Sequence, residues 1–126
     1  MPFETTPTQF DVMVREAIAD LPEKFRQALE VVRVEVRDRP TPQQLKSVGL
    51  EHDELLLGLY EGVPLTERSV MDVPRPPDVI LLFKEDLEDA CDDAAMLREE
   101  VRVTLFHELG HYFGFDEDEL RQLGYG

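Results

Sequence analysis

The chain has 126 residues, of which 42% are apolar and 33% are charged. This length and balance exclude an intrinsically disordered chain, and we expect one domain over residues 1–126. The net charge of −15, from 28 acidic and 13 basic side chains, excludes nucleic acid as a favoured partner, because most of the surface would repel a polyanion.

The first third of the chain predicts two helical segments followed by a strand. Apolar side chains recur at three- and four-residue spacing from Phe10 to Leu21, which predicts an amphipathic helix with Thr8 as its N-cap. A short second helical segment begins at Pro22. Over residues 31–36, valines interleave with charged side chains, which indicates a strand with one buried face.

The middle of the chain predicts a short helix, two strands and a long loop. Residues 41–48 can form a helical turn that ends at Gly49, and the mostly apolar residues 55–60 predict the second strand. Residues 64–77 carry four prolines without apolar periodicity and predict a loop. Residues 79–83 form an uninterrupted β-favouring run, which predicts a central strand buried on both faces.

The last third of the chain predicts three helices. Apolar residues at helical spacing among acidic ones predict a helix over residues 85–94, with Cys91 as a buried thiol. A longer helical pattern covers residues 97–113 and stops at Gly114. Residues 116–123 predict a short final helix that is capped by its first residue.

The cellular location is predicted from cysteine use and from the absence of targeting signals in the sequence. Cys91 is the single cysteine, so no intrachain disulfide can form, in contrast to small secreted domains. The first residues lack the basic and apolar regions of an export signal, and no apolar run reaches membrane-spanning length. We therefore expect a cytoplasmic protein with no membrane partner.

The predicted long helix carries the sequence His107-Glu108-Leu109-Gly110-His111, which matches H-E-x-x-H. Histidines four residues apart lie on nearly one face of a helix, so both imidazoles can bind one tetrahedral zinc ion. Glu108 projects beside them, where its carboxylate can accept a proton from metal-activated water. The pattern predicts Zn2+ as the cofactor, His107 and His111 as metal ligands, and Glu108 as the catalytic residue.

A catalytic zinc site needs a third protein ligand, because one coordination position stays open for water. Gly114 permits a left-handed turn that can return the following residues toward the metal. Three consecutive acidic residues, Asp116, Glu117 and Asp118, follow this turn. We expect the third ligand to be one of them.

These residues resemble the minimal zincin-like metallopeptidases, a family of small bacterial proteins with an H-E-x-x-H-x-x-G-x-x-D type motif near the C-terminus. The resemblance spans most of the chain and includes residues 58–69, 79–83, 98–104 and 120–125. It implies an α+β fold, with a small mixed sheet of three to four strands packed against helices that include the helix of the motif. It also implies the activity of a zinc metallopeptidase.

The sequence departs from the family motif at the third metal ligand. The position ten residues after His107 is Glu117, where the motif of the family has aspartate. Glu117 keeps the spacing and has the longer side chain, whereas Asp116 keeps the residue type one position early. We rank Glu117 first, Asp116 second and Asp118 third.

We expect a hydrolase that acts on peptide bonds of a peptide or protein substrate. In this mechanism Glu108 removes a proton from metal-activated water and then delivers it to the leaving amine. Tyr60, Tyr112 and Tyr125 are candidates to stabilise the oxyanion. In zincins an edge strand aligns an extended substrate, and the predicted strand over residues 55–60 is a candidate for this role.

Three alternatives stay open at this point. A non-catalytic zinc-binding or interaction module could use the same ligands to stabilise the C-terminal helices, although a structural site would more often close the zinc with four protein ligands. Hydrolysis of a non-peptide bond would share the same metal chemistry, and other divalent metals also accept imidazole and carboxylate ligands. His52 lies between two acidic residues, and we expect it to be a solvated side chain without a metal.

Overall fold

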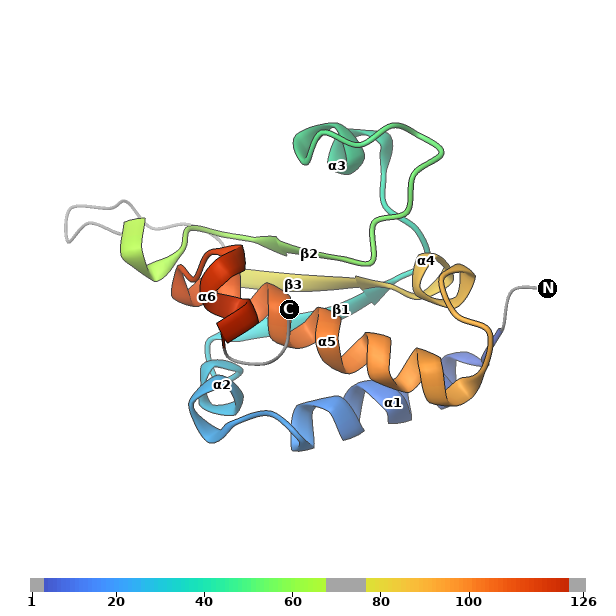
Figure 1. Ribbon diagram of the computed structural model, residues 1–126, viewed down its shortest axis with the longest axis horizontal. Helices are drawn as coiled ribbons and strands as arrows, with labels where there is room; N and C mark the ends of the chain where they lie inside the picture. The colour runs from blue at the N-terminus through green and yellow to red at the C-terminus, as the bar shows by residue number, and fades with distance from the viewer. Residues whose placement is uncertain (1–3, 68–76, 123–126) are drawn as a thin grey trace.

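The computed structural model describes residues 4–67 and 77–122, without the side chains of Glu67 and Glu117. In this structure the long helix α5 packs against α1 and against strands β2 and β3 (Figure 1). The elements are, in chain order, α1 (Pro7–Ala19), α2 (Glu23–Ala28), β1 (Val32–Arg37), α3 (Pro42–Ser47), β2 (Gly58–Glu61), the 3-10 helix η1 (Leu65–Glu67), β3 (Asp78–Phe83), α4 (Lys84–Asp89), α5 (Ala94–Phe113) and α6 (Glu117–Gln122).

The three strands form a mixed sheet in the order β1-β3-β2. β1 runs parallel to β3 along its whole length, and β2 runs antiparallel to β3 with Leu59 opposite Leu81. The sequence predicted β3 as the central strand buried on both faces, and residues 80–83 are all buried. The α+β class and the mixed sheet packed against helices are therefore as predicted, and β2 is one of the two edge strands of this sheet.

The hydrophobic core lies between the sheet and the helices. Val32 of β1 and Ile80 and Leu82 of β3 belong to one buried cluster with the apolar side of α5, so that one face of the sheet and the helices exclude water together. The core cluster consists of Phe10, Met13, Val14, Ala17, Leu21, Phe25, Ala28, Val32, Ile80, Leu82, Leu87, Cys91, Leu97, Val101, Leu105, Phe106, Leu109, Tyr112 and Leu120. The prediction that Cys91 is a core thiol is confirmed.

Helix α1 begins two residues earlier than the sequence predicted. The N-cap is Thr6, whose hydroxyl accepts a hydrogen bond from the N–H of Gln9, while the Gln9 side chain accepts one from the N–H of Thr6. Pro7 follows at the first helical position, where its missing N–H costs no hydrogen bond. The prediction of Thr8 as the cap is wrong, because the Thr6–Gln9 pair already provides hydrogen-bond acceptors for free N–H groups at the helix start, and Pro7 has no N–H that needs one.

The second strand and the acidic helix are both shorter than predicted. The predicted strand over residues 55–60 forms only from Gly58, because the N–H of Leu56 donates to the Asp86 carboxylate instead of to the sheet. The predicted helix over residues 85–94 ends at Asp89, and Asp93 then caps α5 by accepting a hydrogen bond from the N–H of Met96. The predicted loop over residues 64–77 begins with η1, and residues 68–76 lie outside the described part of the chain.

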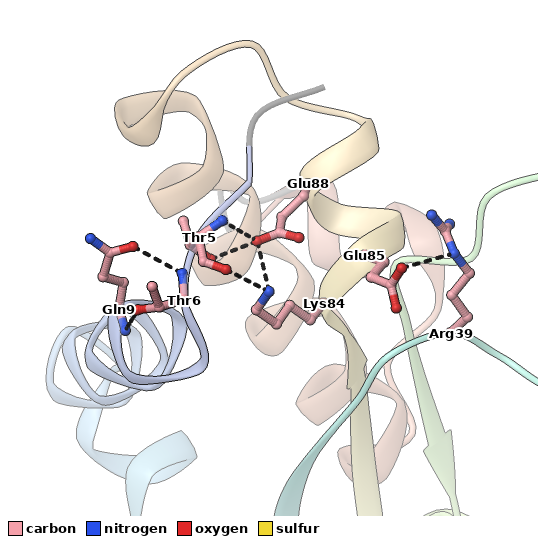
Figure 2. A network of polar contacts seen from close by, with 7 residues as sticks. All are labelled: Thr5, Thr6, Gln9, Arg39, Lys84, Glu85 and Glu88. Carbon is pink, nitrogen blue, oxygen red and sulfur yellow. Dashed lines mark hydrogen bonds and ion pairs between the residues drawn. The ribbon is translucent and has the colours of Figure 1, made fainter. Parts of the chain in front are cut away.

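The segment before α1 is tied to α4 by a partly buried network of polar contacts (Figure 2). Glu88 accepts hydrogen bonds from the N–H and the hydroxyl of Thr5, and Lys84 pairs with Glu88 and donates to the carbonyl of Thr5. Across residues 4–67 and 77–122, no helix combines the length and the apolar character needed to cross a membrane.

Candidate metal centre

His107, Glu108 and His111 come together on the C-terminal half of α5. Each of the three side chains places one potential ligand atom within 4.8 Å of the other two. The two imidazole rings lie 4.8 Å apart between centroids, and both histidines are half-buried while Glu108 is buried. The spacing of four residues therefore brings the histidines to one face of the helix, as the motif predicted.

Glu108 makes a hydrogen bond to the edge strand β2. The backbone N–H of Tyr60 donates to Glu108 Oε1 at 2.8 Å. Gly58 allows this close approach, because a Cβ at position 58 would lie 2.6 Å from Thr104 Cγ2 and 3.4 Å from Glu108 Cγ. The absence of a side chain at residue 58 thus lets β2 lie directly against the helix that carries the histidines.

The turn after α5 reverses the chain direction. Gly114 has φ of +87°, and the N–H groups of Gly114 and Phe115 donate to the carbonyls of His111 and Gly110. These two bonds form a Schellman motif, which favours glycine because its left-handed conformation strains other residues. The prediction that Gly114 would end the helix in a left-handed turn is confirmed.

Helix α6 then packs back against α5 beside the histidines. Leu120 is fully buried, and a Cβ at Gly110 would lie 2.3 Å from Leu120 Cδ2. The glycine inside the H-E-x-x-H motif therefore makes room for α6. This packing keeps α6, which carries the predicted third ligand Glu117, against the C-terminal half of α5.

The three candidate third ligands have different surroundings. Asp116 is exposed and caps α6, since its carboxylate accepts from the N–H of Glu119 and the Glu119 carboxylate accepts from the N–H of Asp116. Asp118 is exposed and pairs with Arg121. Among the described side chains, neither aspartate joins the group formed by His107, Glu108 and His111. The side chain of Glu117 lies outside the described part of the structure, so its role as third ligand stays a prediction.

Of the tyrosines proposed as oxyanion donors, two lie near the motif. The hydroxyl of Tyr60 donates to the buried carboxylate of Asp78 at 2.9 Å, and the ring packs edge to face on Tyr112, which is itself buried. Tyr125 lies outside the described residues. Sequence reasoning missed Asp78, although an acidic residue at the start of the most apolar strand was a visible exception to the pattern.

The donor set of this site fits a zinc ion. Two imidazoles on one helical face are nitrogen ligands of the kind found in zinc sites with three protein ligands, and the carboxylate of Glu108 lies beside them. His52, the remaining histidine, is exposed in the segment between α3 and β2, away from this group. The potential ligands therefore gather at one place, beside an edge strand.

An α+β fold with an H-E-x-x-H helix packed against an edge strand defines the zincin class of metal-dependent proteins. The chain belongs to the zincin-like metallopeptidase family, whose sequence profile matches residues 29–126. No curated protein sequence matches the chain significantly. Membership of this family implies a divalent metal, which His107, Glu108 and His111 could hold.

Proposed function

We propose that the protein is a zinc-dependent metallopeptidase in which His107 and His111 bind the metal and Glu108 is the general base. The observation that carries this proposal is the position of the Glu108 carboxylate, which lies beside both imidazoles and against the edge strand. Glu117 is the proposed third ligand, with Asp116 and Asp118 as alternatives. Bound zinc would supply a Lewis acid that activates water and polarises the scissile carbonyl.

Glu108 has the surroundings of a proton carrier. It is buried, so its carboxylate acts in a region of low dielectric, and the bond from Tyr60 N–H fixes the direction of Oε1. In the proposed reaction this carboxylate takes a proton from the attacking water and gives it to the nitrogen of the leaving amine. A purely structural metal site has no use for an acidic side chain held in this way.

The proposed substrate is an extended segment of a peptide or protein. Among the described residues β2 pairs with β3 and lies at an edge of the sheet, so its outer side is the proposed place for an extended peptide to add beside the Tyr60–Glu108 bond. Tyr60 lies opposite Ile80, and its N–H points to Glu108, so this outer side of β2 faces the helix of the motif. A peptide added there would pass the His107 and His111 side chains.

Metal content of the purified protein tests the proposal first. We expect about one zinc ion per wild-type chain, retention in Glu108→Gln and loss in His111→Ala, when no chelator or metal-binding tag is used. His52→Ala is the matched control, because it removes an exposed histidine far from the motif and should keep the zinc. A chain that binds no metal after zinc is added back would show that the proposal is wrong.

Hydrolysis of a peptide library, followed by mass spectrometry, tests the activity. The zinc-loaded wild type should cleave peptides, and Glu108→Gln should not, although it binds zinc. Full cleavage by Glu108→Gln would contradict the role of the glutamate. Zinc binding by both proteins without any cleavage would favour the alternative of a non-catalytic zinc-binding module.

A further inference from the structure

A continuous hydrogen-bonded connection links Asp78 of β3, Tyr60 of β2 and Glu108 of α5. Asp78 Oδ2 accepts from the hydroxyl of Tyr60 at 2.9 Å, and Tyr60 N–H donates to Glu108 Oε1 at 2.8 Å. We propose that Tyr60 and Asp78 are positioning residues, which hold the edge strand so that its backbone fixes the Glu108 carboxylate. This inference rests on the proposed role of Glu108 as general base.

The position of Asp78 in the sheet supports a clamping role. The β2–β3 ladder ends where Glu61 lies opposite Val79, so Asp78 lies one residue beyond the last pair. Tyr60 lies opposite Ile80, and its hydroxyl therefore reaches diagonally along the sheet to Asp78. Strand ends open more readily than strand centres, and this bond joins the two strands where the ladder stops.

The surroundings of the pair restrict its movement. A Cβ at Gly62 would lie 2.5 Å from Asp78 Oδ1 and 2.7 Å from the Tyr60 hydroxyl, so the backbone after β2 folds closely over both groups. The Tyr60 ring also packs edge to face on Tyr112 of α5, with 6.1 Å between centroids. The side chain of Tyr60 is thus held by β3 and by α5, while its backbone holds Glu108.

The buried carboxylate of Asp78 also supports a positioning role rather than a role in packing alone. Asp78 is 5% exposed, and a buried carboxylate carries a desolvation cost that an apolar side chain in this strand would avoid. Its hydrogen bond from a tyrosine recovers part of that cost and gives the pair a defined geometry. General bases need such definition, because their side chains must stay within about 0.5 Å of the productive position.

The test uses two conservative variants and one matched control. Tyr60→Phe removes the hydroxyl and keeps the ring, while Asp78→Asn removes the charge and leaves residue 60 unchanged. Glu88→Gln is the control, because Glu88 is also a buried carboxylate with hydrogen-bond donors, but its partners Thr5 and Lys84 lie away from β2 (Figure 2). Glu108→Ala is the reference variant, because in it the N–H of Tyr60 no longer has the Glu108 carboxylate as its acceptor.

The main measurement is the chemical shift of the residue-60 amide proton in the metal-free, isotope-labelled protein. Because an amide bonded to a carboxylate is shifted downfield, Asp78→Asn and Tyr60→Phe should move this signal toward its position in Glu108→Ala. Glu88→Gln should leave it in place. In the zinc-loaded enzyme, both variants should lower kcat about tenfold and leave KM within about twofold. A misplacement of a catalytic group by 1 Å can lower the rate about 100-fold, and we expect a smaller displacement of the Glu108 carboxylate here.

The proposal is overturned if the amide signal in Asp78→Asn and Tyr60→Phe coincides with that of wild type in folded protein. It is equally overturned if Glu88→Gln moves the signal as far, because the effect would then report general loosening of the fold. The amide measurement does not depend on hydrolysis. A protein without peptidase activity would therefore contradict the proposed function while the connection from Asp78 to Glu108 could still be established.

Discussion

Leu120 of α6 lies directly over Gly110 of α5, with no space between them for a Cβ. Gly110 stands between the two histidines of the H-E-x-x-H motif, so the same helical turn carries the potential ligands and receives α6. The family motif leaves this position open, and in this chain it has a definite steric role. The contact connects the packing of α6 to the geometry of the metal centre.

Gly110→Ala should therefore destabilise the protein despite the better helix propensity of alanine. The new Cβ would lie 2.3 Å from Leu120 Cδ2 and 3.1 Å from Leu120 Cγ, so the buried Leu120 side chain or α6 itself must move. Overpacking of this kind costs about 1 to 3 kcal/mol, against a propensity gain of up to about 1 kcal/mol. Urea unfolding should show a net loss of stability, and zinc affinity should fall with it because α6 carries the predicted third ligand.

A double-mutant cycle separates this contact from a general effect of the substitution. Leu120→Ala alone should cost about 2 to 5 kcal/mol, because it leaves a cavity in the core. In the double variant the methyl group added at position 110 fills part of the space that Leu120→Ala empties, so Gly110→Ala should be neutral or stabilising on the Leu120→Ala background. Additive losses in the cycle would mean that Leu120 is not the group that excludes a side chain at position 110.

The third ligand can be identified by removing one carboxylate charge at a time. Glu117→Gln should weaken zinc binding by more than about tenfold, which is the scale on which even the loss of outer partners of a metal ligand acts. Asp118→Asn tests the third-ranked candidate and should change the affinity little, because Asp118 is exposed and paired with Arg121. Competition with a chelating zinc indicator measures all variants on one scale.

Asp116→Asn adds a specific control, since asparagine caps a helix as well as aspartate does. Asp116 caps α6 through the N–H of Glu119, so Asp116→Asn should keep α6 folded and should change zinc affinity little. A large loss of zinc affinity in Asp116→Asn, with Glu117→Gln unchanged, would reverse our ranking and assign the third ligand to Asp116.

The sequence allowed the central strand and the long helix to be predicted because their signals are local. Residues 79–83 are uniformly apolar, and the motif helix keeps its spacing up to Gly114. The long helix carries His107, Glu108 and His111, and so the potential ligand group could be predicted from the sequence. The positive φ of Gly114 was predictable for the same reason, because a glycine after a helical pattern favours a left-handed cap.

The contacts that orient the site could not be predicted, because they join residues far apart in the chain. The bond from Tyr60 N–H to Glu108 spans 48 positions, and any non-proline residue at position 60 would carry the same donor. The shortening of β2 has a similar cause, since the N–H of Leu56 donates to the carboxylate of Asp86, which lies 30 positions later in the chain. Side-chain type indicates what a residue can bind, but tertiary packing decides which backbone group it meets.

Cys91 should be unreactive in the folded protein. Its side chain is 1% exposed, and burial, together with the nearby carboxylates of Glu100, Asp92 and Asp93, raises the pKa of the thiol to about 11 from 9.0. At a given pH below 9 this shift makes the reactive thiolate about 100-fold rarer than in the unfolded chain. Labelling with iodoacetamide, followed by mass spectrometry, should modify Cys91 only as urea unfolds the protein. Rapid labelling of the folded protein at pH 8 would contradict this environment.

The network at Glu88 should make the stability of the protein depend on pH in the acid range (Figure 2). Burial alone would raise the pKa of Glu88, but the hydrogen bonds from Thr5 and Lys84 outweigh it and hold the pKa below the ordinary value of 4.5. Since the folded state has the lower pKa, this stabilisation is present above about pH 4.5 and is lost as the pH falls through the folded value.

Glu88→Gln should therefore lower the free energy of unfolding at pH 7 by about 3 kcal/mol. Lys84, which is largely shielded from water, would keep its bond to the Thr5 carbonyl but lose the charge that balances its own. The difference from wild type should narrow as the pH falls from 4.5 through the lowered pKa of Glu88, because the folded wild type then takes up the proton and loses the stabilising charge. Glu99→Gln is the matched control: its partner Arg102 also lowers the pKa of Glu99, but the pair is exposed and should contribute less than about 1 kcal/mol. Urea unfolding of the three proteins between pH 3 and pH 7 measures the effect, and an equal stability difference at every pH would mean that the charge of Glu88 does not stabilise the fold.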